Sequence, residues 1–99
     1  MRKLGIVRSI AVTVTTPATQ IIGPSQQRVA LLFSPPTTAG QSYTVSTDPS
    51  VVLAAGLNLT TTIGPILITE ELYGDAVKKA WFAISSSNFT IGFLETIVD

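Results

Sequence analysis

Short runs of alternating apolar and polar residues, separated by turn residues, dominate this chain. In the first run, 5–15, Ile10, Val12 and Val14 occupy one face and smaller or polar residues occupy the other. A period of two residues with many β-branched side chains predicts a strand. Pro17 ends this strand, because proline cannot donate to a sheet ladder.

Further extended segments follow at short intervals, bounded mostly by Gly, Pro, Asp, Asn or Ser. We expect them at 18–22, 26–34, 41–47, 51–53, 57–59, 66–69, 79–85 and 89–95. The segment 26–34 is apolar on both faces, which predicts a central strand buried on two sides. In 41–47, Tyr43 and Val45 are expected to point inward. The last two segments predict a closing hairpin across 86–88.

One stretch, 70–77, favours a helical turn, with Thr69 as its N-cap and Gly74 limiting its length. Together these patterns predict an all-β protein, a small antiparallel β-sandwich or jelly-roll-like domain of about eight strands. The 99 residues make a single domain. Within it, 1–16 form an N-terminal strand that could serve as an inter-subunit arm, and 17–99 form the sandwich. Periodicity does not separate a jelly roll from an immunoglobulin-like sandwich.

The candidate core comes from the inward positions of these strands. Trp81 lies beside Phe82 in a strand, which favours a core or subunit-interface role over a ligand platform shared with Tyr73. The predicted core residues are Val29, Leu31, Phe33, Trp81, Phe89, Ile91 and Phe93.

Composition indicates a surface that is largely covered. Charged residues make up 12% of the chain, about half the usual share of roughly 25%. Hydrophobic residues reach 45%, which excludes disorder. A small domain with so little charge is expected to bury part of its outside against copies of itself or a larger partner.

Net charge is zero and the basic residues are scattered, so the sequence predicts neither a nucleic-acid partner nor a membrane partner. The chain has no histidine and no cysteine, which removes the usual triads, zinc sites and disulfides.

An enzyme would need facing carboxylates, for which Glu70 or Glu71 with Glu95 is the available pair. Solvated loop or edge charges are the preferred interpretation of all three. Asp75 could join Glu70 and Glu71 around calcium, but the alternating pattern of a calcium loop is missing. The sequence therefore predicts no catalytic residue, metal or cofactor.

Three stretches, 21–36, 64–86 and 89–95, resemble a family of small proteins encoded among the structural genes of tailed bacteriophages. A "PxxxRxALxxSPP"-like segment is carried by Pro24, Arg28, Ala30, Leu31, Ser34, Pro35 and Pro36. A "LTxExxGDxVxxxWxAI"-like segment is matched by Ile68, Thr69, Glu71, Gly74, Asp75, Val77, Trp81, Ala83 and Ile84. The terminal strand of the resemblance ends in Glu95. The resemblance spans roughly 75 of the 99 residues and excludes the first twenty.

The resemblance implies a non-enzymatic virion structural protein, made in the bacterial host cytoplasm. The expected role is a capsid decoration (cement) protein that binds the outer surface of the major capsid lattice and stabilises it. The expected partners are the major capsid protein and further copies of the chain, by analogy in a homotrimer. The alternative is a small tail or head-fibre component that acts as a receptor- or carbohydrate-binding module, with Tyr73 or Trp81 exposed. The predicted contact residues are Glu70, Glu71, Tyr73, Asp75, Lys78 and Lys79 of the charged turn, with Pro35 and Pro36 of the 35–40 loop.

Overall fold

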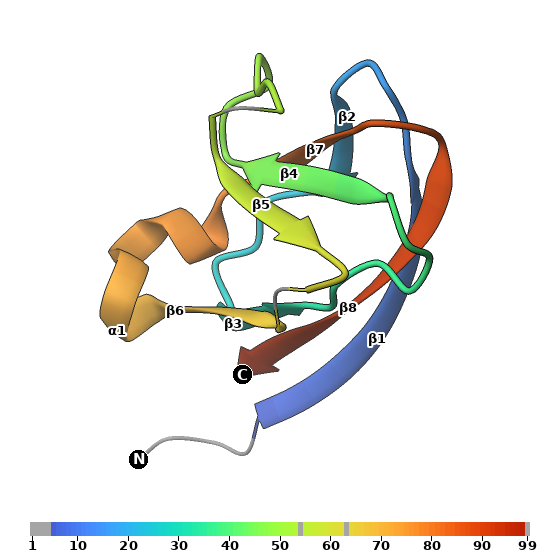
Figure 1. Ribbon diagram of the computed structural model, residues 1–99. Coiled ribbons are helices and arrows are strands. Elements are labelled where there is room, and N and C mark those ends of the chain that lie inside the picture. The colour runs from blue at the N-terminus through green and yellow to red at the C-terminus, as the bar shows by residue number, and fades with distance from the viewer. Residues whose placement is uncertain (1–4, 54, 63, 99) are drawn as a thin grey trace.

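Two four-stranded antiparallel sheets pack face to face in the computed structural model, which describes residues 5–53, 55–62 and 64–98 (Figure 1). This confirms the all-β prediction and the expected number of strands. The elements are β1 (Gly5–Val14), β2 (Thr19–Ile22), β3 (Arg28–Phe33), β4 (Ser42–Ser46), β5 (Leu57–Thr60), β6 (Ile66–Thr69), α1 (Glu70–Tyr73), the 3₁₀ turn η1 (Gly74–Lys78), β7 (Trp81–Ser85) and β8 (Phe89–Val98).

The strand order is β1-β8-β3-β6 in the first sheet and β2-β7-β4-β5 in the second. The predicted closing hairpin is therefore wrong, because β7 and β8 belong to different sheets. The residues between them, 86–88, carry the chain across the sandwich. Backbone groups at this crossing bond elsewhere, from the Ser85 amide to the Thr15 carbonyl and from the Ser86 amide to the Ser42 carbonyl. Both strands are apolar on one face, and in a sandwich these two faces can be buried against each other.

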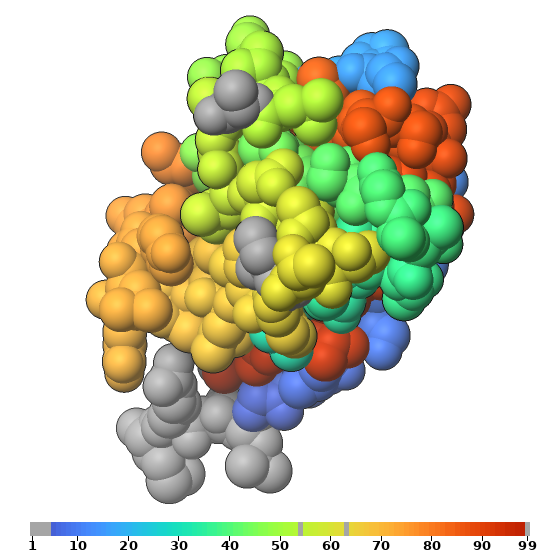
Figure 2. Space-filling model, viewed as in Figure 1, coloured from blue at the N-terminus to red at the C-terminus, as the bar shows by residue number. Residues whose placement is uncertain are grey.

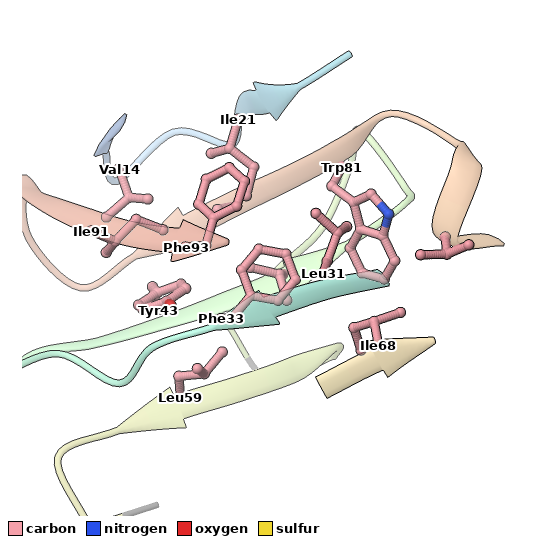
Figure 3. Close-up of a cluster of buried hydrophobic side chains, with 13 residues drawn as sticks. Val14, Ile21, Leu31, Phe33, Tyr43, Leu59, Ile68, Trp81, Ile91 and Phe93 are labelled. Atoms are coloured by element: carbon pink, nitrogen blue, oxygen red, sulfur yellow. The ribbon is translucent and has the colours of Figure 1, made fainter. Parts of the chain in front are cut away.

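The core lies between the inner faces of the two sheets (Figure 3). Phe33 is at its centre, with ring centroids 5.8 Å from Trp81 and 5.3 Å from Phe93. Tilted aromatic packing of this kind adds to the free energy of simple area burial. Leu31 and Ile91 are also buried in this cluster, and Phe89 packs against it half-buried.

Val29 is the predicted core residue that lies outside the buried cluster. The pairing of β3 with β8 shifts register between Arg28 and Ala30, so Val29 is the extra residue of a β-bulge. The bulge changes which residues point inward. It leaves Val29 half-buried and turns Arg28, rather than Val29, into the interior.

The helical segment begins as predicted, with the Thr69 hydroxyl accepting a hydrogen bond from the Leu72 amide. The α-helical turn ends at Gly74, whose φ of 59° lies in the region that glycine adopts without strain. The 3₁₀ turn then extends the segment to Lys78, and it buries Val77 under the end of the sandwich. In Figure 2 this segment (orange) bulges from one side of the molecule. Among the described residues, no helix is long and apolar enough to cross a bilayer.

The expected strand at 51–53 does not form. Of the residues described in this stretch, only Val52 and Ala55 make a bridge, within a loop that precedes β5. Gly56 has a φ of 140°, and a Cβ at this position would lie 2.7 Å from the Thr44 methyl group. The loop therefore packs tightly against β4 instead of extending as a strand.

β1 and β8 form a ribbon of ten consecutive residue pairs, from Gly5 with Val98 to Val14 with Phe89. The strands of the second sheet have four or five residues each, so they cannot cover the whole ribbon. The first half of β1 is exposed as a result, and the molecule measures 45 Å along its longest axis. Of the predicted N-terminal segment, 1–4 lie outside the described residues. The rest is an integral strand of the first sheet.

Replacing Trp81 with Ala is expected to lower the free energy of unfolding by about 3–5 kcal/mol, because the buried indole packs against Phe33 in the core. Phe82→Ala is the matched comparison, since Phe82 is half-buried on the opposite face of the same strand, and its loss should be smaller. Chemical denaturation of the two variants measures this difference. A Trp81→Ala protein that melts like the wild type would contradict the core assignment.

Because the phenol of Tyr43 is buried, we expect the free energy of unfolding to fall at alkaline pH. Its hydroxyl donates to the Ser34 carbonyl at 2.6 Å inside the core, and burial raises the pKa of this phenol above its usual value. The folded state therefore holds the proton more tightly than the unfolded state. Its contribution to stability should be present below about pH 10 and decline as pH rises further. Urea denaturation as a function of pH should show a shallower alkaline decline in Tyr43→Phe than in the wild type. The exposed-ring control Tyr73→Phe should keep the wild-type slope.

Candidate interaction surfaces

A buried guanidinium, that of Arg28, connects four parts of the chain at the open end of the sandwich. Its Nε donates to the Glu95 carboxylate at 2.7 Å. One terminal nitrogen donates to the carbonyls of Val77, at 3.0 Å, and Lys79, at 2.9 Å, and the other donates to the carbonyl of Gly23. A buried charge is tolerated when it is paired and hydrogen-bonded in this way. The arrangement is structural, because its donors are directed at the protein itself.

Glu95 is buried, and the prediction of a solvated edge charge is wrong for this residue. It continues the inward alternation of Ile91 and Phe93 along β8, a signal that was visible in the sequence. Its second oxygen accepts from Arg8 at 3.1 Å, directly across the β1–β8 pair. Since each oxygen is held by a guanidinium, Glu95 does not supply the free carboxylate that the enzyme alternative needs.

The charged turn is fastened to β3 by Lys78. Its ammonium group donates to the carbonyls of Gln26 and Arg28, both at 3.0 Å, and it pairs with Glu70 at 2.9 Å. Lys78 is thus engaged within the chain, and its side chain is only 17% exposed. Its role as an interface contact stays a prediction. Among the described residues, no group of three acidic side chains could hold a metal ion.

The other predicted contact residues divide by exposure. Pro36 is buried and Pro35 is half-buried, so Pro36 cannot act as the surface contact that was expected. The five remaining contact residues predicted in the turn are all exposed: Glu70, Glu71, Tyr73, Asp75 and Lys79.

A shallow hollow of about 240 Å³ lies beside Tyr73. The Tyr73 ring is 43% exposed, whereas Trp81, which also lines the hollow, is only 4% exposed. Gly56 and Leu57 also line the hollow. One accessible aromatic ring beside an apolar hollow is a weaker platform for a sugar than two exposed rings would be.

A larger feature is the solvent-facing side of the β1-β8-β3-β6 sheet, here termed the outer face. Strand register places Ser9, Leu94, Leu32 and Leu67 in one row across all four strands. Leu67 is 53% exposed and Leu94 is 36% exposed. The described members of the outer face are exposed or half-buried and carry no charge: Val7, Ser9, Ala11, Thr13, Ala30, Leu32, Leu67, Thr69, Thr90, Gly92, Leu94, Thr96 and Val98.

The outer face explains the apolar character of β3. The strand is central, as predicted, but only one of its faces is buried, since Ala30 and Leu32 remain half-buried on the outer face. The second sheet differs at β4, where the loop before β5 covers part of its outside. There, Thr44 is fully buried, donates to the Leu53 carbonyl at 2.9 Å and accepts from the Asn58 amide at 2.9 Å. The outsides of the two sheets therefore differ: the loop covers the second sheet at Thr44, whereas the outer face of the first sheet leaves Leu67 and Leu94 exposed.

Comparisons of the chain with family models, with curated proteins and with solved structures find no match. The resemblance to phage structural proteins therefore stays a prediction.

Replacing Arg28 with Met is expected to lower the free energy of unfolding by about 3–5 kcal/mol. The reason is that a buried carboxylate oxygen and three carbonyl groups lose their hydrogen-bond donor. Arg8→Met is the matched control. It removes the other partner of Glu95, but that partner is 59% exposed, so the expected loss is below about 1 kcal/mol. Guanidinium denaturation compares the two, and equal losses would contradict a structural role for the buried pair.

Proposed function

We propose that this chain is a non-enzymatic structural protein of a phage virion, which decorates the capsid by docking its outer face on the major capsid lattice. The observation that carries the proposal is an uncharged surface that extends across all four strands of one sheet and exposes Leu67 and Leu94. The resemblance of 21–36, 64–86 and 89–95 supplies the virion context. In this role the protein works by staying bound and stabilising the shell from outside.

The physical demands of such a role fit the outer face. Strands lie about 4.8 Å apart and rise about 3.3 Å per residue, so a sheet of this size offers several hundred Å² to a partner. A standard protein interface takes about 800 Å² from each side. Burying exposed leucines such as Leu67 and Leu94 yields about 25 cal/mol for each Å² removed from water. Because the outer face carries no charge, such binding should depend little on salt.

The charged turn lies at the end of β6, next to the outer face. Its exposed residues Glu70, Glu71 and Lys79 suit the polar rim of an interface rather than its centre. The proposal therefore moves the main contact from the turn, where the sequence placed it, to the sheet.

Leu67→Lys is expected to weaken binding to the shell at least about tenfold, because it places a charge in the middle of an apolar contact. Leu72→Lys makes the same change at a more exposed leucine of α1, within the charged turn, and should bind normally. The measurement is co-sedimentation with shells assembled from the same virus's major capsid protein, prepared without this chain.

Three results of this experiment are informative. Loss with Leu67→Lys alone supports docking by the outer face. Loss with Leu72→Lys alone would place the contact on the charged turn and overturn the docking surface. A wild-type protein that ignores the shells would overturn the decoration role.

The hollow beside Tyr73 favours a second candidate, a receptor- or carbohydrate-binding module of a tail or head fibre. An exposed ring next to an apolar wall can stack on a sugar face. Trp81 is the single tryptophan of the chain and lines the same hollow, so its fluorescence reports occupancy. Titration with host surface glycans should shift this emission in the wild type and fail to do so in Tyr73→Ala. An unchanged wild-type spectrum would remove the candidate.

A further inference from the structure

β1 is an exposed sheet edge of unusual length for this molecule. Within the described residues, the four edge strands of the two sheets are β1, β6, β2 and β5. β1 has ten residues, and each of the others has four. β1 pairs with β8 on one side, and its other side lies at the rim of the sheet (Figure 1). Every second residue of an edge strand presents its backbone N–H and C=O groups to the outside.

Proteins usually protect long edges against further pairing by means of lysines, prolines, bulges or short strands. β1, with the sequence GIVRSIAVTV, contains neither lysine nor proline. Its pairing with β8 runs through ten residues without a register shift, so no bulge twists it away. Its single charge, Arg8, is directed at Glu95 of the neighbouring strand at 3.1 Å. The edge therefore has the properties of a strand that accepts a partner.

We propose that β1 pairs antiparallel with β1 of a second copy of this chain, about a twofold axis that passes beside Ser9. This inference goes beyond the proposed function and does not depend on it. It replaces the free N-terminal arm suggested by the sequence with an edge-to-edge contact of an ordered strand. It also predicts a dimer in place of the trimer expected from the resemblance.

The residue types of β1 select a second copy and this register. With Ser9 at the axis, Val7 faces Ala11 of the other copy and Ile6 faces Val12, so apolar side chains meet on both faces of the sheet. Arg8 then lies directly opposite Ile10, and its own equivalent is a diagonal neighbour at about 7–8 Å. An axis at Arg8 would set two like charges directly against each other, which is unfavourable. Identical patches with almost no charge are self-complementary in this way, as a twofold interface requires.

The number of hydrogen bonds is adequate for a specific contact. An antiparallel pair centred on Ser9 overlaps over Gly5–Thr13 and exchanges about eight to ten backbone hydrogen bonds. A typical interface contains about ten. The two four-stranded sheets would join into one continuous sheet of twice the width. Their outer faces would then form a single uncharged surface, available to a larger partner.

The first test is the mass in solution by light scattering behind a sizing column. The wild type is expected at twice the 10.4 kDa of the chain. Ser9→Lys places two lysines at the axis beside Arg8 and should weaken the dimer at least about tenfold. Thr90→Lys is the matched control, because Thr90 is exposed on the same outer face but belongs to β8, away from the edge. It should remain dimeric.

The second test uses the absence of cysteine from the chain. Facing residues of an antiparallel pair have Cα atoms about 4.5–5.5 Å apart, which a disulfide can bridge. Ser9→Cys should therefore form a covalent dimer under mild oxidation, with loss of both thiols as one S–S bond forms and the added oxidant, such as oxidised glutathione, is reduced. Thr90→Cys should remain mostly monomeric on a non-reducing gel.

A dimer that Ser9→Lys dissociates and Ser9→Cys cross-links supports the proposal. A wild-type trimer, a monomer even at millimolar concentration, or a dimer insensitive to Ser9→Lys would overturn it. The monomer result would instead point to an extended segment of another protein as the strand that pairs with β1. Shell binding is measured separately, so failure of the dimer and failure of the decoration role remain distinguishable.

Discussion

The buried guanidinium of Arg28 is the constraint on which the open end of this fold depends. A cation removed from water must be paired and hydrogen-bonded on all sides, and here its partners come from distant parts of the chain. Glu95 belongs to the last strand, Gly23 to the linker before β3, and Val77 and Lys79 to the end of the helical segment. Because these groups must converge on one planar group, the arrangement of all three segments is specified together.

Lys78 reinforces this convergence from the outside. It binds the carbonyls of Gln26 and Arg28 while pairing with Glu70 at the start of the helical segment. Of the six basic residues, Arg28 and Lys78 therefore make hydrogen bonds and ion pairs within the chain, and Arg8 is directed at Glu95. The low charge content of the chain leaves few charges for its surface. This is why one whole sheet face can be free of them.

The two sheets differ in what they leave uncovered. The strands of the second sheet are short, and a loop buries Thr44 on its outside. The first sheet has two ten-residue strands, an apolar outer face and a long free edge. Face and edge are adjacent and belong to the same strands, so a partner on one and a second copy on the other are compatible. The uncharged outer face and the long free edge therefore lie on a single sheet.

Local pattern was enough to determine the all-β class, most strand positions, the inward placement of Tyr43 and the Thr69 cap, because each depends on neighbours a few residues apart. The burial of Glu95 was also predictable from the alternation along 89–95, in which Phe89, Ile91 and Phe93 point inward. Its polarity nevertheless suggested an exposed charge. Only the tertiary structure decided that β7 and β8 separate into different sheets, that Val29 forms a bulge and that Arg28 turns inward. It also decided which apolar face stays open. These features depend on pairings between residues far apart in the chain, and a period of two residues contains no information about which strand lies beside which.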